Sequence, residues 1–136
     1  MVDRIYNGVY EGERNARVAF PLGGIGAGNL CLEGTGALSH FSLRHTPDLA
    51  NEPQAFAAVR VKGRAGSVAR VLEGQVPEWK VFGNRTTGFI GSGNGLPGKH
   101  YGLPRFADSA FRARFPFGTV TLRDPVIPLD IRVTGW

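Results

Sequence analysis

The chain has almost no cysteine and no long apolar run. Its single cysteine, Cys31, excludes an internal disulfide and any metal site built from several cysteines. No segment approaches the roughly 18 consecutive apolar residues that a membrane-spanning helix needs. Residues 1–8 show no cationic region followed by an apolar core, so no secretory signal is visible. We therefore expect a cytoplasmic protein without a transmembrane segment.

Histidine is scarce and dispersed. His40, His45 and His100 lie apart, and the odd offset between the first two would place them on opposite sides of an extended strand. A nucleophile elbow of the G-x-S-x-G type is also missing, because the sequence around Ser92 is too short for it. We expect no metal site and no cofactor.

Neither of two glycine-rich segments fits a nucleotide loop. Gly24 and Gly26 begin a G-x-G-x-x-G pattern, but Asn29 occupies the position of the third glycine and no helical pattern follows. Residues 93–99 match G-x-x-x-x-G-K, but His100 stands where the hydroxyl that binds magnesium is required. Turn and loop chemistry explains both segments better.

The chain carries 16 basic residues against 11 acidic ones, yet it has no basic block. Its cations alternate with other residues in strand-like runs, as at Arg112 and Arg114, where they would line a solvated face or contact a partner domain. Binding to nucleic acid is the less favoured alternative, because there is neither a basic helix nor an aromatic RNA-recognition motif.

What is abundant is alternation of apolar and polar residues between glycine and proline. This pattern predicts an all-β chain, an incomplete β-sandwich with long glycine-rich loops and little helix. A further short strand is a candidate at residues 78–82, one helical turn is conceivable at 108–111, and residues 82–104 read as a long loop. The expected strands are 28–33, 38–43, 56–62, 67–72, 113–123 and 129–134.

Glycine is concentrated near the front of the chain. Gly23, Gly24, Gly26 and Gly28 fall within six positions, although glycine loses more backbone freedom on folding than any other residue. Such density predicts a tight backbone passage with at least one positive φ angle.

Two segments carry a family resemblance. The run FPLGGIGAG at 20–28, with the sequence at 30–45, resembles the opening of the N-terminal domain of glycoside hydrolase family 116. Residues 101–106 and 115–136 resemble the next strands of that domain. The family includes non-lysosomal glucosylceramidases and bacterial β-glucosidases. The resemblance covers residues 17–136 and leaves residues 1–16 as an N-terminal extension.

The resemblance implies a β-sandwich that packs on an (α/α)₆ catalytic barrel, the partner we expect. In the family both catalytic carboxylates lie in that barrel, and no position here matches their motifs, so we expect no catalytic residue. The family pattern continues into further strands, so we expect an incomplete domain that is inactive alone. The parent enzyme would act on a β-glucoside or glucosylated glycan.

A second hypothesis is a stand-alone carbohydrate-binding β-module. Trp79 and Tyr101 are its candidate residues, because aromatic rings can stack on sugars. Core packing is the alternative role for Trp79.

Overall fold

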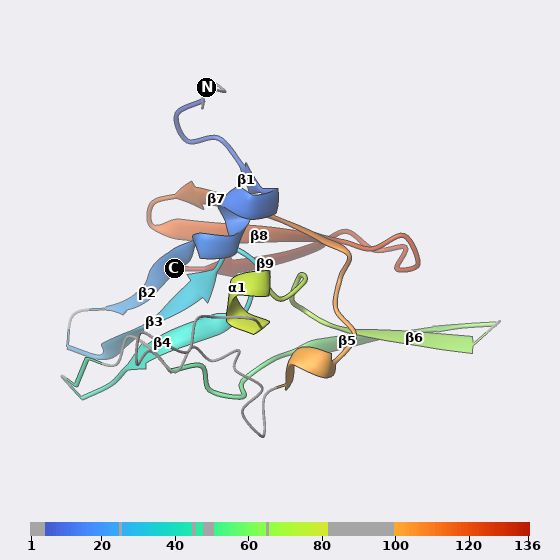
Figure 1. Ribbon diagram of the computed structural model, residues 1–136, viewed down its shortest axis with the longest axis horizontal. Helices are drawn as coiled ribbons and strands as arrows, with labels where there is room; N and C mark the ends of the chain where they lie inside the picture. The colour runs from blue at the N-terminus through green and yellow to red at the C-terminus, as the bar shows by residue number, and fades with distance from the viewer. Residues whose placement is uncertain (1–4, 25, 45, 48–50, 65, 82–99) are drawn as a thin grey trace.

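The computed structural model describes residues 5–24, 26–44, 46–47, 51–64, 66–81 and 100–136 (Figure 1). In these residues nine strands form three antiparallel sheets. In the described ranges, helix is confined to the four-residue α1 (Glu78–Val81) and to two 3₁₀ segments, η1 (Gly12–Arg17) and η3 (His100–Gly102). The all-β prediction is therefore confirmed.

The largest sheet has the strand order β1-β7-β8-β9. It joins β1 (Tyr10–Glu11) to a meander of β7 (Asp108–Arg114), β8 (Phe117–Arg123) and β9 (Ile131–Gly135). In β8 and β9 more buried residues alternate with more exposed ones, and in β7 the same holds from Phe111 to Arg114. One face of this sheet therefore points into the core and the other points to solvent.

Two smaller sheets complete the fold. The second has the order β2-β3-β4, with β2 (Ala19–Gly24), β3 (Gly28–Glu33) and β4 (Leu38–Ser42). The third is the hairpin of β5 (Ala58–Gly63) and β6 (Gly66–Val71), which projects to one side in Figure 1.

The two larger sheets pack face to face. The rings of Phe20 on β2 and Phe111 on β7 lie 5.8 Å apart. Glycine makes this approach possible, because a Cβ atom on Gly118 would lie 2.7 Å from the Phe20 ring. The buried apolar side chains of the core are Leu32, Phe106, Phe111, Val120, Leu122 and Ile127. Burying apolar surface between two sheets is the main stabilising term of such a sandwich.

The predicted strands agree with the structure in four places and differ in others. Strand 28–33 is found as predicted, 38–43 ends one residue earlier, and 56–62 and 67–72 differ by one or two residues at both ends. The final strand begins at 131 rather than 129. The predicted strand 113–123 is two strands, 108–114 and 117–123, joined by a turn.

Two local predictions are wrong. Residues 78–81 form helix α1 rather than a strand, and residues 108–111 begin β7 rather than a helical turn. The strands β1 and β2 were not predicted at all. Of the predicted loop 82–104, residues 82–99 lie outside the described part of the chain, and η3 follows them.

Asp124, just after β8, ties the hairpin β5–β6 to the largest sheet. Its Oδ1 accepts a hydrogen bond from the Val126 amide at 2.9 Å, and its Oδ2 accepts one from Arg70 Nε at 2.9 Å. The Val126 amide first, and Arg70 with it, hold the pKa of Asp124 below its ordinary value.

This depressed pKa predicts a specific loss of stability in acid. A carboxyl with a lower pKa in the folded state stabilises the fold fully above its unfolded pKa, near pH 4, and loses that effect as the pH falls through the folded pKa. We expect the Asp124→Asn variant to be less stable than the parent at pH 7. The difference in their free energies of unfolding, measured by urea unfolding, should narrow below pH 4. The exposed Asp130→Asn serves as control, and a difference independent of pH would contradict this reading.

Candidate functional site

The glycine run forms the turn of the β2–β3 hairpin, in which Gly24 pairs with Gly28. The φ angles are 120° at Gly23, 79° at Gly26 and 92° at Gly28, so the positive φ that the glycine density predicted is present. A Cβ atom on Gly23 would lie 2.6 Å from the Gly28 carbonyl oxygen, and one on Gly28 would lie 2.6 Å from the Ser42 oxygen. Gly24 is different, because nothing lies within 4 Å of its Cβ position.

Two open grooves flank this turn. The first, of about 380 Å³, is apolar and is lined by side chains that include Leu22, Leu30, Leu43 and Trp136. The second, of about 530 Å³, lies on Gly24, Gly26 and Gly28 and also borders Asn29, Ser42 and Thr46. The glycines thus allow two surfaces of different polarity to meet at one narrow loop.

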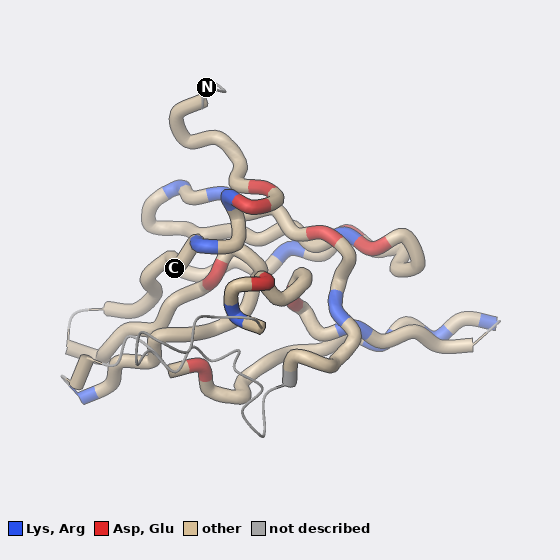
Figure 2. The backbone as a smooth tube through the Cα atoms, viewed as in Figure 1, with Lys and Arg blue, Asp and Glu red and all other residues tan. Residues whose placement is uncertain are grey.

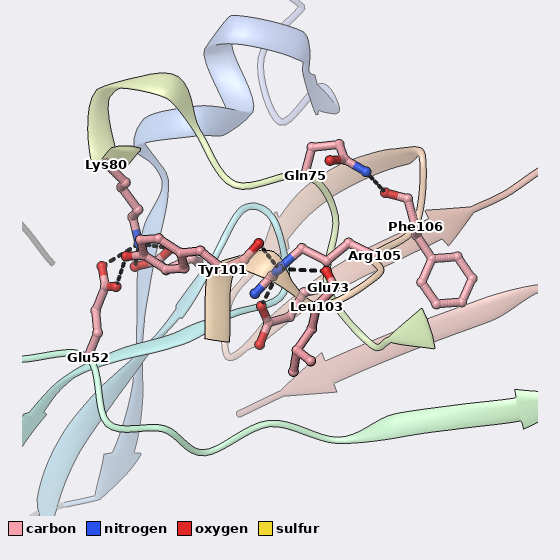
Figure 3. A network of polar contacts seen from close by, with 9 residues as sticks. Glu52, Glu73, Gln75, Lys80, Tyr101, Leu103, Arg105 and Phe106 are labelled. Atoms are coloured by element: carbon pink, nitrogen blue, oxygen red, sulfur yellow. Dashed lines mark hydrogen bonds and ion pairs between the residues drawn. The ribbon is translucent and has the colours of Figure 1, made fainter. Parts of the chain in front are cut away.

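A cluster of buried charges lies at the far end of β3. Lys80 of α1 donates to both carboxylate oxygens of Glu33, each at 2.6 Å, and to Glu52 Oε1 at 2.5 Å. The Tyr101 hydroxyl donates to the other oxygen of Glu52. Figure 3 shows Lys80 and Tyr101 converging on Glu52. The Lys80 side chain is only 4% exposed, so these carboxylates hold its charge inside the protein.

A second ion pair continues the cluster. Arg105 Nε lies 3.2 Å from Glu73 Oε2, and both side chains are buried. The Arg105 Nη1 group donates to the carbonyl oxygens of Tyr101, at 2.8 Å, and Leu103, at 3.0 Å (Figure 3). Arg105 thereby shapes the backbone of residues 101–105 around its guanidinium group. We name Glu33, Glu52, Glu73, Lys80, Tyr101 and Arg105 the charged cluster.

The charged cluster encloses too little space for a sugar. The cavity between its members has a volume of about 20 Å³, which is room for about one water molecule. Its three carboxylates share two cations at hydrogen-bonding distance. Acid–base hydrolysis needs two carboxyl groups that both reach a substrate. The ion pairs and hydrogen bonds of the charged cluster therefore connect four segments of the chain: the end of β3, residue 52, α1 and residues 101–105.

A repeated tripeptide places two of these carboxylates. Leu-Glu-Gly occurs at 32–34 and again at 72–74, and in each copy the glutamate and the glycine are buried. The two copies lie side by side, since the Gly74 amide donates to the Thr35 carbonyl oxygen at 2.7 Å. Sequence reasoning singled out only Tyr101 of the charged cluster, in a different role, and this repeat was the signal that could have found Glu33 and Glu73. No comparable signal marks Glu52, Lys80 or Arg105.

Of the two aromatic residues predicted as sugar platforms, Tyr101 belongs to the charged cluster and Trp79 lies beside it. Trp79 donates its indole N–H to the Ala16 carbonyl oxygen at 2.9 Å, and the cationic groups of Arg17 and Lys80 lie 5.3 Å and 5.5 Å from its ring centre. Tyr101 is partly buried and bound to Glu52. Their use in sugar stacking stays a prediction.

The remaining titratable residues are separate. Burial, followed by the nearby Glu33 carboxylate, raises the pKa of the Cys31 thiol. His40 Nδ1 lies 2.6 Å from Ser39 Oγ, while His45 and the side chain of His100 lie outside the described residues. Within the described ranges there is no group of three potential metal ligands among His, Cys, Asp and Glu. Within the same ranges, no helix has the length and apolar character to cross a membrane.

Comparison with known proteins identifies one family. Residues 19–136 match the family described as beta-glucosidase 2, glycosyl-hydrolase family 116 N-term. The match includes the glycine turn, the charged cluster and both larger sheets apart from β1. No curated protein matches the chain.

Proposed function

The chain belongs to the family of glycoside hydrolase family 116 N-terminal domains, and we propose that it is a non-catalytic β-sandwich module of a β-glucosidase-like enzyme. In this role it packs on an (α/α)₆ catalytic barrel, and its glycine turn helps to shape the sugar cleft. The family match over residues 19–136 is the observation that carries the proposal.

The ion pairs formed by the carboxylates of the charged cluster support a non-catalytic role. Glu33 and Glu52 share Lys80, and Glu73 pairs with Arg105. A glycosidase acid must deliver a proton to the leaving oxygen, and its partner carboxylate must approach the anomeric carbon. Carboxylates held by buried cations around a cavity of about 20 Å³ meet neither need.

The apolar groove beside the glycine turn supports packing on another domain. Leu43 is 55% exposed and Trp136 is 74% exposed, and both line this groove. Exposed apolar side chains grouped at one place often mark a contact surface. The positive φ angles at Gly23 and Gly28 bring bare backbone to the same surface, where a partner could approach closely.

The first test is activity. We expect the purified 136-residue chain to show no hydrolysis of an aryl β-glucoside at pH 5–7 above a control without protein. The physical reason is that none of the carboxylates in the charged cluster can reach a substrate. Robust turnover that is lost on Glu33→Gln or Asp108→Asn would contradict the proposal.

The second test is association with a catalytic barrel. We expect an (α/α)₆ domain of a family 116 enzyme, supplied as a separate polypeptide, to bind the chain in isothermal titration. The Leu43→Asp variant should weaken this binding about tenfold, which is about 1.4 kcal/mol, because it places a charge in the apolar groove. Val126→Asp is the matched control, since Val126 is also 55% exposed but lies outside the groove. Equal effects of the two variants would count against the groove as the contact.

A further inference from the structure

The outer face of the largest sheet carries four arginines. Arg112 and Arg114 point outward from β7, Arg123 from β8 and Arg132 from β9, and all four are exposed. They line a groove of about 430 Å³ that also includes Thr119 and Thr121. We name this groove with its four arginines the arginine face. It lies opposite the core, because residues that point to the other side of the same strands, such as Phe111 and Val120, are buried.

These four arginines differ from Arg70 and Arg105 in their ionic contacts. Arg70 and Arg105 form ion pairs with Asp124 and Glu73. Across the described ranges, by contrast, none of the four arginines of this face takes part in an ion pair. Lys and Arg are otherwise spread along the described parts of the chain, as Figure 2 shows. The arginine face thus carries a net positive charge: its four guanidinium groups form no ion pair among the described residues, although Asp108 stands opposite Arg123 across β7–β8 and Glu11 lies in the groove.

The spacing of the arginine face suits an extended partner. Outward residues of one strand are about 7 Å apart and neighbouring strands are about 4.8 Å apart, so the four guanidinium groups spread over three strands. Thr119 pairs with Arg112 across β7–β8, and Thr121 pairs with Arg132 across β8–β9. Arginine binds a carboxylate through two parallel hydrogen bonds, and a threonine hydroxyl beside it can add a third.

We propose that the arginine face binds the carboxylate-bearing surface of a partner protein. Charge complementarity selects an acidic partner, and the carboxylate of Glu11 in the same groove makes the face mixed rather than uniformly basic. A nucleic acid fits less well, because the sequence has neither a basic helix nor an aromatic RNA-recognition motif and Phe117, opposite Arg114, stands at the hairpin end. This inference goes beyond the proposed function and does not rest on it.

Fluorescence anisotropy with labelled poly-L-glutamate tests the proposal. We expect binding in low-salt buffer that weakens about tenfold in the double variant Arg112→Gln/Arg132→Gln. The matched control is Lys62→Gln/Arg64→Gln, which removes the same charge from the β5–β6 hairpin and its turn at exposed positions. We expect the control to change the affinity less than about twofold, because Lys62 and Arg64 do not line the groove of the arginine face. Circular dichroism and thermal melting of all variants check that the exposed substitutions leave the fold intact.

Three results would overturn the proposal. The first is an absence of binding to poly-L-glutamate by the parent chain. The second is an equal loss of affinity in the two double variants, which would show attraction by net charge alone. The third is tighter binding of duplex DNA than of poly-L-glutamate with the same dependence on Arg112 and Arg132, which would make the face a phosphate-binding surface.

Discussion

Replacing Gly34 by alanine should destabilise the protein by more than about 3 kcal/mol, at or above the upper end of overpacking effects. A Cβ atom at this position would lie 2.1 Å from Asn15 Oδ1 and 2.3 Å from the Asn15 main-chain oxygen. Asn15 cannot move away freely, because it is buried and its side-chain amide donates to Ser109 Oγ at 2.9 Å and to the Ser109 carbonyl oxygen at 3.2 Å. The clash therefore breaks the link between η1 and β7 or displaces the end of β3.

Gly24→Ala is the matched control for this prediction. Gly24 ends β2, the neighbour of β3, its φ is not positive and its Cβ position is open, so we expect a change below about 1 kcal/mol. Denaturant unfolding measures both variants. If Gly34→Ala does not fold, the soluble fraction and the circular dichroism spectrum report that outcome directly.

An additional variant locates the clash. Asn15→Gly in the Gly34→Ala background removes the side-chain contact but leaves the main-chain oxygen at 2.3 Å. We therefore expect no full recovery of stability. A Gly34→Ala protein as stable as the Gly24→Ala protein would show that the backbone of η1 yields to the added methyl group.

The second large effect is expected at Lys80. Lys80→Met keeps most of the side-chain volume but removes the cation that Glu33 and Glu52 share. Removing one partner of a buried ion pair leaves the other charge uncompensated, which typically destabilises by about 3–5 kcal/mol. We expect a loss of this size in denaturant unfolding at neutral pH, with little change for the exposed Lys62→Met.

A compensating substitution distinguishes charge from packing. Glu33→Gln in the Lys80→Met background removes one of the two carboxylates that shared the Lys80 cation, so we expect it to restore part of the lost stability. Without recovery, the contribution of Lys80 would lie in its packing near Trp79, whose ring centre is 5.5 Å from the ammonium group. A Lys80→Met protein as stable as Lys62→Met would contradict the prediction altogether.

The hairpin β5–β6 shows why part of the fold was predictable. Valines at 59, 61 and 68 alternate with polar or small residues on both sides of the glycine-bounded turn 63–66, and this period belongs to a strand alone. The glycine turn at 23–28 was predictable for a related reason. Positive φ angles favour glycine, so a dense run of glycines in the sequence indicates where such angles occur.

Strand β2 and helix α1 show where local pattern fails. In β2 the residues Pro21, Gly23 and Gly24 have low strand propensity, and pairing with β3 holds them extended. Polar and apolar residues alternate at 78–82 as they do in a strand, yet α1 forms there. Its helical turn lets Lys80 reach Glu33 and lets Trp79 bind the Ala16 carbonyl oxygen. Such contacts decide the conformation of a segment only four residues long.

The sequence alone determined the all-β class, most of the β3-to-β6 strand positions, the tight glycine passage and the family resemblance, because alternation, glycine and motif are local properties of the chain. Only the tertiary structure decided which charged side chains form ion pairs with one another and which form none. Lys80 lies 47 residues from Glu33 and 28 from Glu52, and no periodic signal spans such separations. Strand pairing likewise gathered four arginines from β7, β8 and β9 on one face, because a strand's period sets which residues share a side but not which strands become neighbours.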